Sequence, residues 1–255
     1  DWAQAPDSSA KVTTIHDLAP FLYPDEHESK IVSVHKARMH WVVAECDAII
    51  CVSHNTANDM ATLFPETKAK ITVIPEALPA RFVHPAHKSP LSDYLIAIGA
   101  RQPRKNISRL VSSYLRFKSK LRLPDRLVIT GEVGNRIQHP SITYTGYVTD
   151  SLLTTLLAGA EAFVYPSLYE GFGLPILGAF HHHIPVACSN TSSFPEVAGS
   201  AASYFDPTDE ESLAHGIATA IKDRAKLIRA GTSQLAKFSW TQTARQTLKV
   251  YQSLI

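Results

Sequence analysis

Three cations lie close together in a short predicted loop near the middle of the chain. Residues 98–106 read IGARQPRKN, in which a predicted strand ends at Gly99, and Arg101, Arg104 and Lys105 follow before a helical pattern begins. Open α/β sheets bind ligands at the carboxyl ends of their strands, and a diphosphate needs cations of this kind to neutralise its charge. Taken alone, the segment fits either a diphosphate site or a solvated basic loop.

A second segment combines an acidic residue with glycines. Residues 165–175 read YPSLYEGFGLP, and Glu170 stands directly before Gly171 and close to Gly173. Glycines let a ligand approach backbone N–H groups, and Pro175 suits the first turn of a helix, whose N-terminus attracts anions. The alternative is that the glycines only shape a strand-to-helix turn and that Glu170 only caps the helix.

The elements that must position these residues alternate along the chain. Short apolar, β-branched runs predict strands over 12–16, 48–52, 71–74, 94–99, 127–130, 142–145, 162–165 and 185–188. Helical patterns cover 30–45, 55–63, 106–119, 150–158, 173–182 and 209–222, and the end of the chain from 223 to 255 is predicted to be all helical, with Ser239 as an N-cap. This alternation predicts an α/β protein with parallel sheets and crossover helices. A proline-rich stretch over 75–93 predicts a domain boundary.

Composition and charge limit the class of protein. The chain has 255 residues, 45% of them hydrophobic, and a formal net charge of +2, so bulk charge gives no reason to expect a nucleic-acid partner. Cys46, Cys51 and Cys188 form no CxxC pair, which argues against a disulfide or zinc framework. There is no apolar run near the ~20 residues of a membrane span, and the N-terminal residues lack a signal-peptide pattern. We expect a cytoplasmic protein whose membrane contact, if any, is weak and peripheral at the inner membrane face.

Several short motifs occur in order along nearly the whole chain. They are TIHDLAP at 14–20, CVSHNT at 51–56, VIP at 73–75, residues 99–106, GYV at 146–148, EGFGLPIL at 170–177, residues 189–199, FDP at 205–207 and FSW at 238–240. Together they resemble retaining glycosyltransferase family four. The resemblance implies a GT-B fold of two Rossmann-like parallel-sheet domains. It assigns an incomplete acceptor-side domain to 1–78, a donor domain to 79–238 and a helix crossing back to the first domain to 239–255.

The resemblance also implies roles for the cations and for a histidine. Arg104 and Lys105 match the pair that grips the donor diphosphate, with Arg101, also close after Gly99, as a competitor for the arginine role. His16 matches a histidine that faces the transferred sugar. The alternative for His16 is a histidine at a strand end that bonds to its own loop.

Further residues are assigned to the donor by the same resemblance. Glu170 would lie near the donor sugar, and the backbone of the turn that follows it would bind sugar hydroxyls and phosphate. Other loops would line the nucleotide base. The residues concerned are Gly171, Phe172, Gly173 and Leu174 in the turn, and Gly131, Gly134, Tyr147 and Val148 at the base.

The sequence also departs from the family's pattern. Gly178 stands where a second glutamate would hold the ribose hydroxyls, and residues 180–183, FHHH, replace a small-residue stretch. Glu76 and Ala77 replace the usual asparagine and glycine. These changes raise the possibility of a degenerate, inactive or partner-dependent relative, in which Phe180 and the following histidines fill the space of the lost glutamate.

Two other segments, the histidines at 181–183 and the basic residues of 116–126, could suggest ligand binding but have simpler explanations. The histidines at 181–183 are poor candidates for a metal site, because consecutive helical residues point about 100° apart. The basic segment 116–126 could contact anionic lipid or nucleic acid, but such a run is more often the solvated end of a helix.

We therefore expect retaining transfer of a hexosyl group from a nucleotide diphosphate sugar to a saccharide or lipid-linked acceptor. The donor is a substrate, and we expect neither a metal nor another cofactor. One alternative is a non-catalytic subunit that binds a partner glycosyltransferase, with the partner chain completing the first domain. Another is a nucleotide-sugar epimerase or hydrolase on the same fold.

Overall fold

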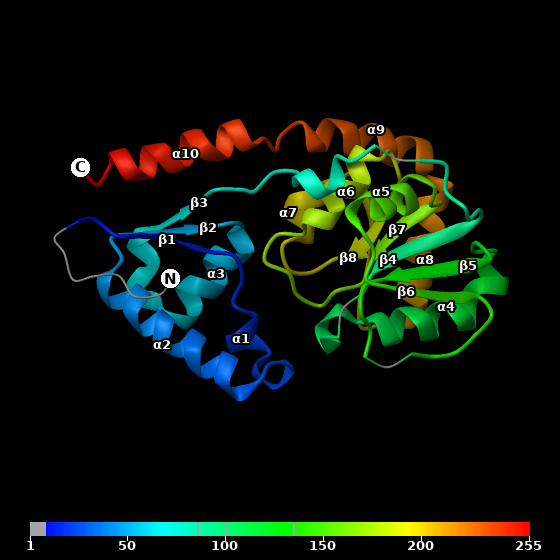
Figure 1. Ribbon diagram of the computed structural model, residues 1–255, viewed down its shortest axis with the longest axis horizontal. Helices are drawn as coiled ribbons and strands as arrows, with labels where there is room; N and C mark the ends of the chain where they lie inside the picture. The colour runs from blue at the N-terminus through cyan, green and yellow to red at the C-terminus, as the bar shows by residue number, and fades with distance from the viewer. Residues whose placement is uncertain (1–8, 86, 100, 135) are drawn as a thin grey trace. The chain divides into compact units, whose positions relative to one another are not determined.

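Two parallel β-sheets organise the chain, one in each of two compact units (Figure 1). The computed structural model describes residues 9–85, 87–99, 101–134 and 136–255. The first unit comprises the chain up to Glu76 together with Ser239–Ile255, and the second comprises Ala77–Phe238. The first eight residues, where the sequence lacks a signal-peptide pattern, lie outside the described residues.

The first unit is built on a three-stranded parallel sheet in the order β1-β2-β3. Its elements are β1 (Val12–Ile15), α1 (Ala19–Leu22), η1 (Pro24–Glu26), α2 (Ser29–Glu45), β2 (Ala48–Cys51), α3 (His54–Leu63), η2 (Pro65–Lys70), β3 (Ile71–Val73) and α10 (Trp240–Gln252). Met39 and Val42 of α2 and Met60 of α3 pack with Ile49 and its neighbours on one face of the sheet. Val250 of α10 packs on the other face. The terminal helix is therefore part of the core of the first unit.

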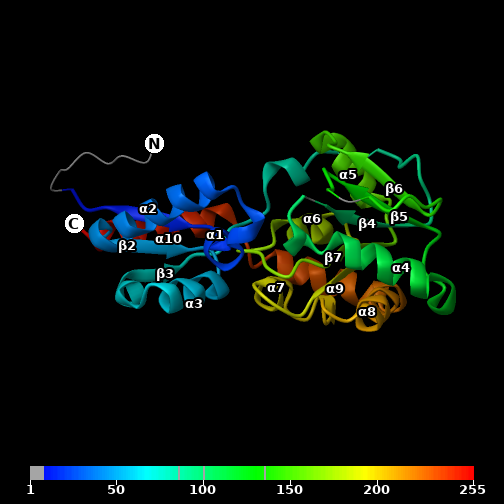
Figure 2. The ribbon, with the colours of Figure 1, turned by 90° about the horizontal axis from the view of Figure 1, so that it is seen from below.

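The second unit contains a six-stranded parallel sheet in the order β6-β5-β4-β7-β8-β9. Its elements are η3 (Ala80–Phe82), β4 (Tyr94–Ile98), η4 (Pro103–Lys105), α4 (Ile107–Leu121), β5 (Arg126–Thr130), β6 (Ile142–Gly146), α5 (Asp150–Ala158), β7 (Ala162–Tyr165), α6 (Leu174–His181), β8 (Val186–Ser189), α7 (Phe194–Ala198), β9 (Ala202–Phe205), α8 (Glu210–Lys222) and α9 (Arg224–Leu235). Helices α4 and α8 share a core with the side chains on one face of the sheet, and α6 packs with α9 (Figure 2).

This strand order contains a topological switch point. From β4 the chain builds the sheet outward in one direction through β5 and β6, and it then returns to β7 on the other side of β4. In open parallel sheets ligands bind outside the carboxyl ends of the two strands that flank such a point. The cation-rich loop follows β4, and the glycine-rich segment follows β7. The tertiary structure therefore brings the two candidate segments to the same edge.

The parallel α/β prediction is confirmed, with differences in detail. All eight predicted strands are present. Strand β9 was missed because its sequence, ASYF, contains no β-branched residue, and the helices α1 and α7 were missed because four or five residues are too few to show a helical period. The strand β4 ends at Ile98 rather than Gly99. The C-terminal segment is not continuously helical, since it breaks between α9 and α10, where Ser239 accepts a hydrogen bond from the Gln242 N–H at 3.2 Å as the predicted N-cap.

Candidate donor site

Asn106 fixes the end of the cation-rich loop. It adopts a left-handed backbone conformation (φ 59°) between η4 and α4 and is 9% exposed. Its Nδ2 donates to the carbonyl of Pro166 at 3.1 Å and to that of Pro207 at 2.8 Å. The amide thereby ties the loop to the segments after β7 and β9. This role could not be predicted from neighbouring residues, because the partners lie 60 and 101 residues away.

Lys105 and Glu170 join the two candidate segments. Lys105 Nζ lies 2.5 Å from Glu170 Oε1, and the two side chains are only 18% and 13% exposed. The ammonium also lies 6.0 Å from the centre of the Tyr165 ring. The pKa of Tyr165 is well above its ordinary value, mainly because the hydroxyl is buried and also because the Glu170 carboxylate is close. The positive charge of Arg104 acts in the opposite direction. Lys105, Glu170, Tyr165 and Arg104 therefore share one electrostatic environment.

The two arginines of the loop lie in different surroundings. Arg104 is 8% exposed, and its carbonyl accepts a hydrogen bond from the Leu168 N–H at 2.7 Å. The Arg101 side chain is 74% exposed and contacts Glu132 at 2.7 Å. Arg104 therefore contributes a buried positive charge that acts on Tyr165, whereas Arg101 is the arginine that a ligand can reach from solvent.

The glycine-rich turn is held by two serines that the sequence did not single out. Ser192 Oγ accepts from the Glu170 N–H at 3.0 Å and donates to the Glu170 carbonyl at 2.7 Å. Ser193 Oγ lies 2.7 Å from the carbonyl of Phe172, to which it donates. Gly173 has φ 106° at the N-cap of α6, a conformation that disfavours any side chain. These contacts fix the backbone from Glu170 to Gly173, which we call the locked turn.

Other predicted residues of this turn have structural positions. Gly171 and Phe172 are buried, and the Phe172 ring packs edge-on against Phe238 at 5.6 Å. Leu174 is the first residue of α6 and is half-buried. The helix N-terminus thus lies directly after the locked turn, where its positive end faces the edge of the sheet.

A pocket of about 260 Å3 lies between the loops after β4 and β5. It is lined by Arg101, Gln102, Pro103, Asn106, Ile107, Ser108, Val133 and Gly134. Gly131 shapes this edge, because it has φ 88° and a Cβ built on it would lie 2.5 Å from the Gly99 carbonyl oxygen. The Gly99 N–H in turn donates to the Thr130 carbonyl at 2.7 Å.

The remaining predicted base-lining residues lie elsewhere. Tyr147 is 81% exposed and Val148 is buried, and neither lines this pocket. Of the four positions assigned to the base, Gly134 lines the pocket and Gly131 shapes the adjoining strand ends.

Gly178 is covered by an aromatic ring. It is buried in α6, and a Cβ built on it would lie 2.5 Å from Phe82 Cδ1. The expectation that Phe180 and the histidines fill this space is wrong, because Phe180 packs against Gly231 instead. His182 contributes only by donating from Nε2 to the Phe82 carbonyl at 2.9 Å. Phe82 was not predicted, because its partner lies 96 positions along the chain.

His16 lies in the first unit, beside a carboxylate that replaces the family's usual residue. Its Nδ1 lies 3.2 Å from Glu76 Oε1, and the two side chains are 68% and 16% exposed. The hydrogen bond to Glu76 is the main cause of a raised His16 pKa, although partial burial opposes it. The histidine therefore pairs with the segment after β3 rather than with its own loop.

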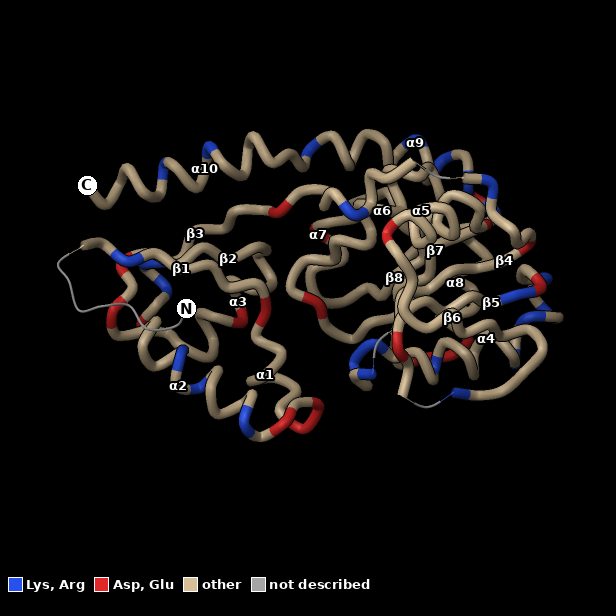
Figure 3. Tube along the Cα trace, in the orientation of Figure 1, with Lys and Arg blue, Asp and Glu red and all other residues tan. Residues whose placement is uncertain are grey.

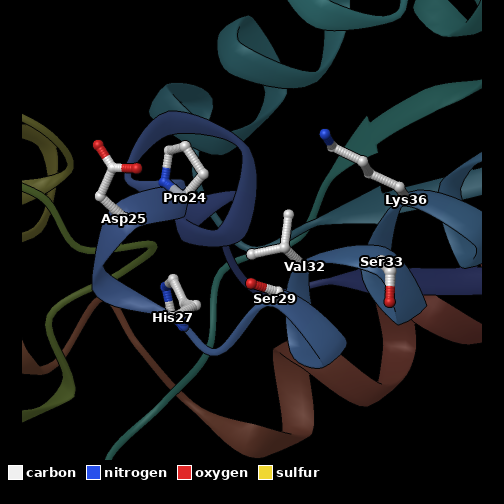
Figure 4. A pocket seen from close by; sticks show the side chains of 7 residues that line it. All are labelled: Pro24, Asp25, His27, Ser29, Val32, Ser33 and Lys36. Carbon is white, nitrogen blue, oxygen red and sulfur yellow. The ribbon is translucent and has the colours of Figure 1, made fainter.

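A second pocket, of about 530 Å3, lies in the first unit between η1 and the start of α2 (Figure 4). It is lined by Pro24, Asp25, His27, Ser29, Val32, Ser33 and Lys36. The lining combines hydrogen-bond donors and acceptors with the apolar surfaces of Pro24 and Val32. Such a lining suits a hydroxyl-rich ligand.

Three cations of the basic segment at the end of α4 form ion pairs, and Figure 3 marks the charged residues along the chain. Arg116 lies 3.4 Å from Glu210, Lys118 lies 3.2 Å from Asp125, and Lys120 lies 3.3 Å from Glu211. These ion pairs favour the structural explanation of the segment. Within the described ranges, we find neither a helix able to span a membrane nor a cluster of His, Cys, Asp and Glu suited to a metal ion.

The fold and the site define a class of protein: an α/β chain with two parallel sheets, in which a cation-rich loop and a glycine-rich turn meet at the switch point of the second. The sequence profile described as Glycosyl transferases group 1 matches residues 84–234, and that described as Glycosyltransferase Family 4 matches residues 5–81. The chain belongs to the Glycosyl transferases group 1 family.

Relatives and solved structures agree with this assignment. The chain is 32% identical to O-antigen chain mannosyltransferase B of Escherichia coli over 95% of its own length and 70% of that protein. It is 28% identical to O-antigen chain mannosyltransferase RfbU of Salmonella typhimurium, over 78% of this chain and 57% of that protein. Anabaena HepE in complex with UDP superposes with a TM-score of 0.73 at 16% identity, over 96% of this chain and 72% of that one. Sucrose-phosphate synthase from Thermosynechococcus elongatus gives 0.71 at 19% identity, over 95% and 67%. The predicted GT-B fold is confirmed.

Proposed function

We propose that this chain transfers a hexosyl group from a nucleotide diphosphate sugar to a saccharide or lipid-linked acceptor, with retention of configuration and without a metal ion. The observation that carries the proposal is the meeting of Lys105 and Glu170 at the switch point, 2.5 Å apart. The names of the two relatives above favour a mannosyl donor as the first to test. The pocket beside α2 is our candidate for binding acceptor hydroxyls.

The proposed chemistry is electrostatic. As the sugar leaves, negative charge builds on the β-phosphate, and fixed cations beside it stabilise the transition state. Lys105 has three N–H donors, so it can contact a phosphate oxygen while it still contacts Glu170. The buried Arg104 would add fixed positive charge to the site, and the exposed Arg101 is accessible to a ligand from solvent. Glu170 would hold sugar hydroxyls from the locked turn.

The test is nucleotide binding by Lys105→Met, measured by calorimetric titration with UDP- and GDP-sugars. Loss of one charge-assisted hydrogen bond of about 1.5–3 kcal/mol should weaken binding roughly 10- to 150-fold. Lys118→Met is a matched control, because Lys118 is a similarly buried, paired lysine (20% exposed) whose partner Asp125 lies outside the site. The double variant Lys105→Met/Glu170→Gln removes the pair as a neutral unit and separates lost binding from an unpaired carboxylate.

Transfer itself is tested with labelled nucleotide-sugars and a panel of saccharide acceptors. A product whose anomeric configuration matches that of the donor supports retaining transfer. Unchanged affinity in Lys105→Met would refute the phosphate grip, and inversion of configuration would refute the retaining mechanism.

One observation favours a second candidate, a non-catalytic GT-B subunit. The Phe82 ring covers Gly178, where the family resemblance places a ribose-binding carboxylate, so the donor site lacks one of its expected anchors. A subunit of this kind would bind none of the nucleotide-sugars and would show no transfer. Wild-type binding to any of them that Lys105→Met weakens, together with measurable transfer, decides in favour of the transferase.

A further inference from the structure

His16 and Glu76 come from opposite edges of the three-stranded sheet in the first unit. His16 follows β1 and Glu76 follows β3, with β2 between them. The carboxyl ends of parallel strands lie at one edge of a sheet, which brings the two side chains within 3.2 Å between Nδ1 and Oε1.

The backbone on both sides of this contact is anchored. The Thr243 hydroxyl of α10 donates to the Pro75 carbonyl at 2.8 Å, directly before Glu76. The Ile74 N–H donates to the Cys51 carbonyl at 2.9 Å and extends the sheet ladder past β3. The Val52 N–H reaches the Ile15 carbonyl at 3.4 Å on the other side, just before His16. Glu76 is therefore presented by rigid sheet-end backbone.

The two side chains differ in exposure in a way that gives them different roles. Glu76 is 16% exposed, so its carboxylate gains from a close hydrogen-bond donor, whereas His16 is 68% exposed and can meet a ligand. A carboxylate only accepts, so the shared proton lies on Nδ1, and Nε2 is the ring nitrogen left for other contacts.

We propose that Glu76 is a positioning residue for His16: its carboxylate accepts from Nδ1–H, fixes the ring and directs Nε2 outward. The functional consequence rests on the transferase activity proposed above and on the place that the family resemblance gives His16, facing the transferred sugar. A protonated ring would then offer an Nε2–H donor to a sugar hydroxyl.

Charged groups around the ring act on the His16 pKa in both directions. Glu76 and Asp17 favour the imidazolium, and Arg38 of α2 opposes it together with partial burial. The hydrogen bond to Glu76 is the largest of these influences and raises the His16 pKa above its ordinary value of 6.5. Removal of the Glu76 charge should therefore lower that pKa.

The experiment is a pH titration of the histidine side chains by ¹⁵N NMR, with the His16 signal identified by its loss in His16→Gln. Glu76→Gln keeps an acceptor oxygen but removes the charge, so we expect the Nδ1–H tautomer to persist and the His16 pKa to fall. Glu76→Ala should lose both the tautomer preference and the raised pKa. Glu66→Gln removes an equally charged but exposed residue of the same unit and should leave His16 unchanged.

Activity provides the second readout. If protonated His16 is the active form, the pH at which kcat falls should move downward in Glu76→Gln and stay in place in Glu66→Gln. An unchanged His16 titration in both Glu76 variants would overturn the proposal. Because the titration does not depend on turnover, a wild type without transferase activity would refute the proposed function and leave the titration to decide the role of Glu76.

Discussion

The contact between Gly178 and Phe82 makes a sharp prediction about stability. A Cβ on Gly178 would lie 2.5 Å from Phe82 Cδ1 and 2.8 Å from Cγ, and real Cβ atoms essentially never approach so closely. The Phe82 ring is 3% exposed, so it cannot simply swing into solvent. Gly178→Ala should therefore force the ring to move.

Two opposing contributions determine how much Gly178→Ala changes the free energy of unfolding. Alanine is better than glycine in the interior of a helix by about 0.8–1 kcal/mol, whereas overpacking a core costs about 1–3 kcal/mol. In the wild-type background Gly178→Ala should be neutral to destabilising by up to ~2 kcal/mol. In a Phe82→Ala background the clash is absent, so the same change should stabilise the protein by about 0.8–1 kcal/mol.

The assay is urea unfolding of the four proteins in this double-mutant cycle, at one pH and with the slope m compared across variants. The expected coupling free energy is about 1–3 kcal/mol. Phe82→Leu replaces Phe82→Ala if the larger truncation unfolds the protein. Gly216→Ala is the control, because Gly216 lies in another helix, α8, where its Cβ would meet Phe205 of β9, and its effect should not depend on residue 82. Coupling below about 0.5 kcal/mol would refute the packing described for Gly178.

Three further predictions follow from the site. Ser192→Ala removes both hydrogen bonds to the Glu170 backbone and should weaken nucleotide-sugar binding in titration calorimetry more than it lowers Tm; an unchanged Kd would contradict the role of the locked turn. The pKa of His182 is lowered below 6.5, mainly by partial burial. As the pH falls below about 6.5, the histidine of the unfolded chain is protonated before that of the folded protein, so the free energy of unfolding decreases. His182→Gln should reduce this acid sensitivity of Tm, and an identical Tm profile would be evidence against it. EDTA should leave transfer unchanged, because Lys105 and the arginines supply the positive charge; loss that a divalent ion restores would point to metal catalysis.

The local pattern of the chain determined its class and most of its elements. Buried strands such as β4 and β7 are continuous apolar runs, and Ser239 carries its capping chemistry in its own side chain, so both could be recognised from neighbouring residues. The candidate cations and Glu170 could be selected because their types suit phosphate and sugar chemistry. Strand β9 escaped prediction, since its sequence ASYF lacks the β-branched residues by which the other strands were recognised.

The tertiary structure alone decided which of these residues meet and which are accessible. Lys105 pairs with Glu170 across 65 positions of sequence because the strand order places β4 beside β7. Arg104 and Arg101 are indistinguishable as letters, yet one is buried and the other reaches solvent. Likewise, Phe82 covers Gly178 because packing between distant segments depends on the whole fold, and no local property of residue 82 reveals it.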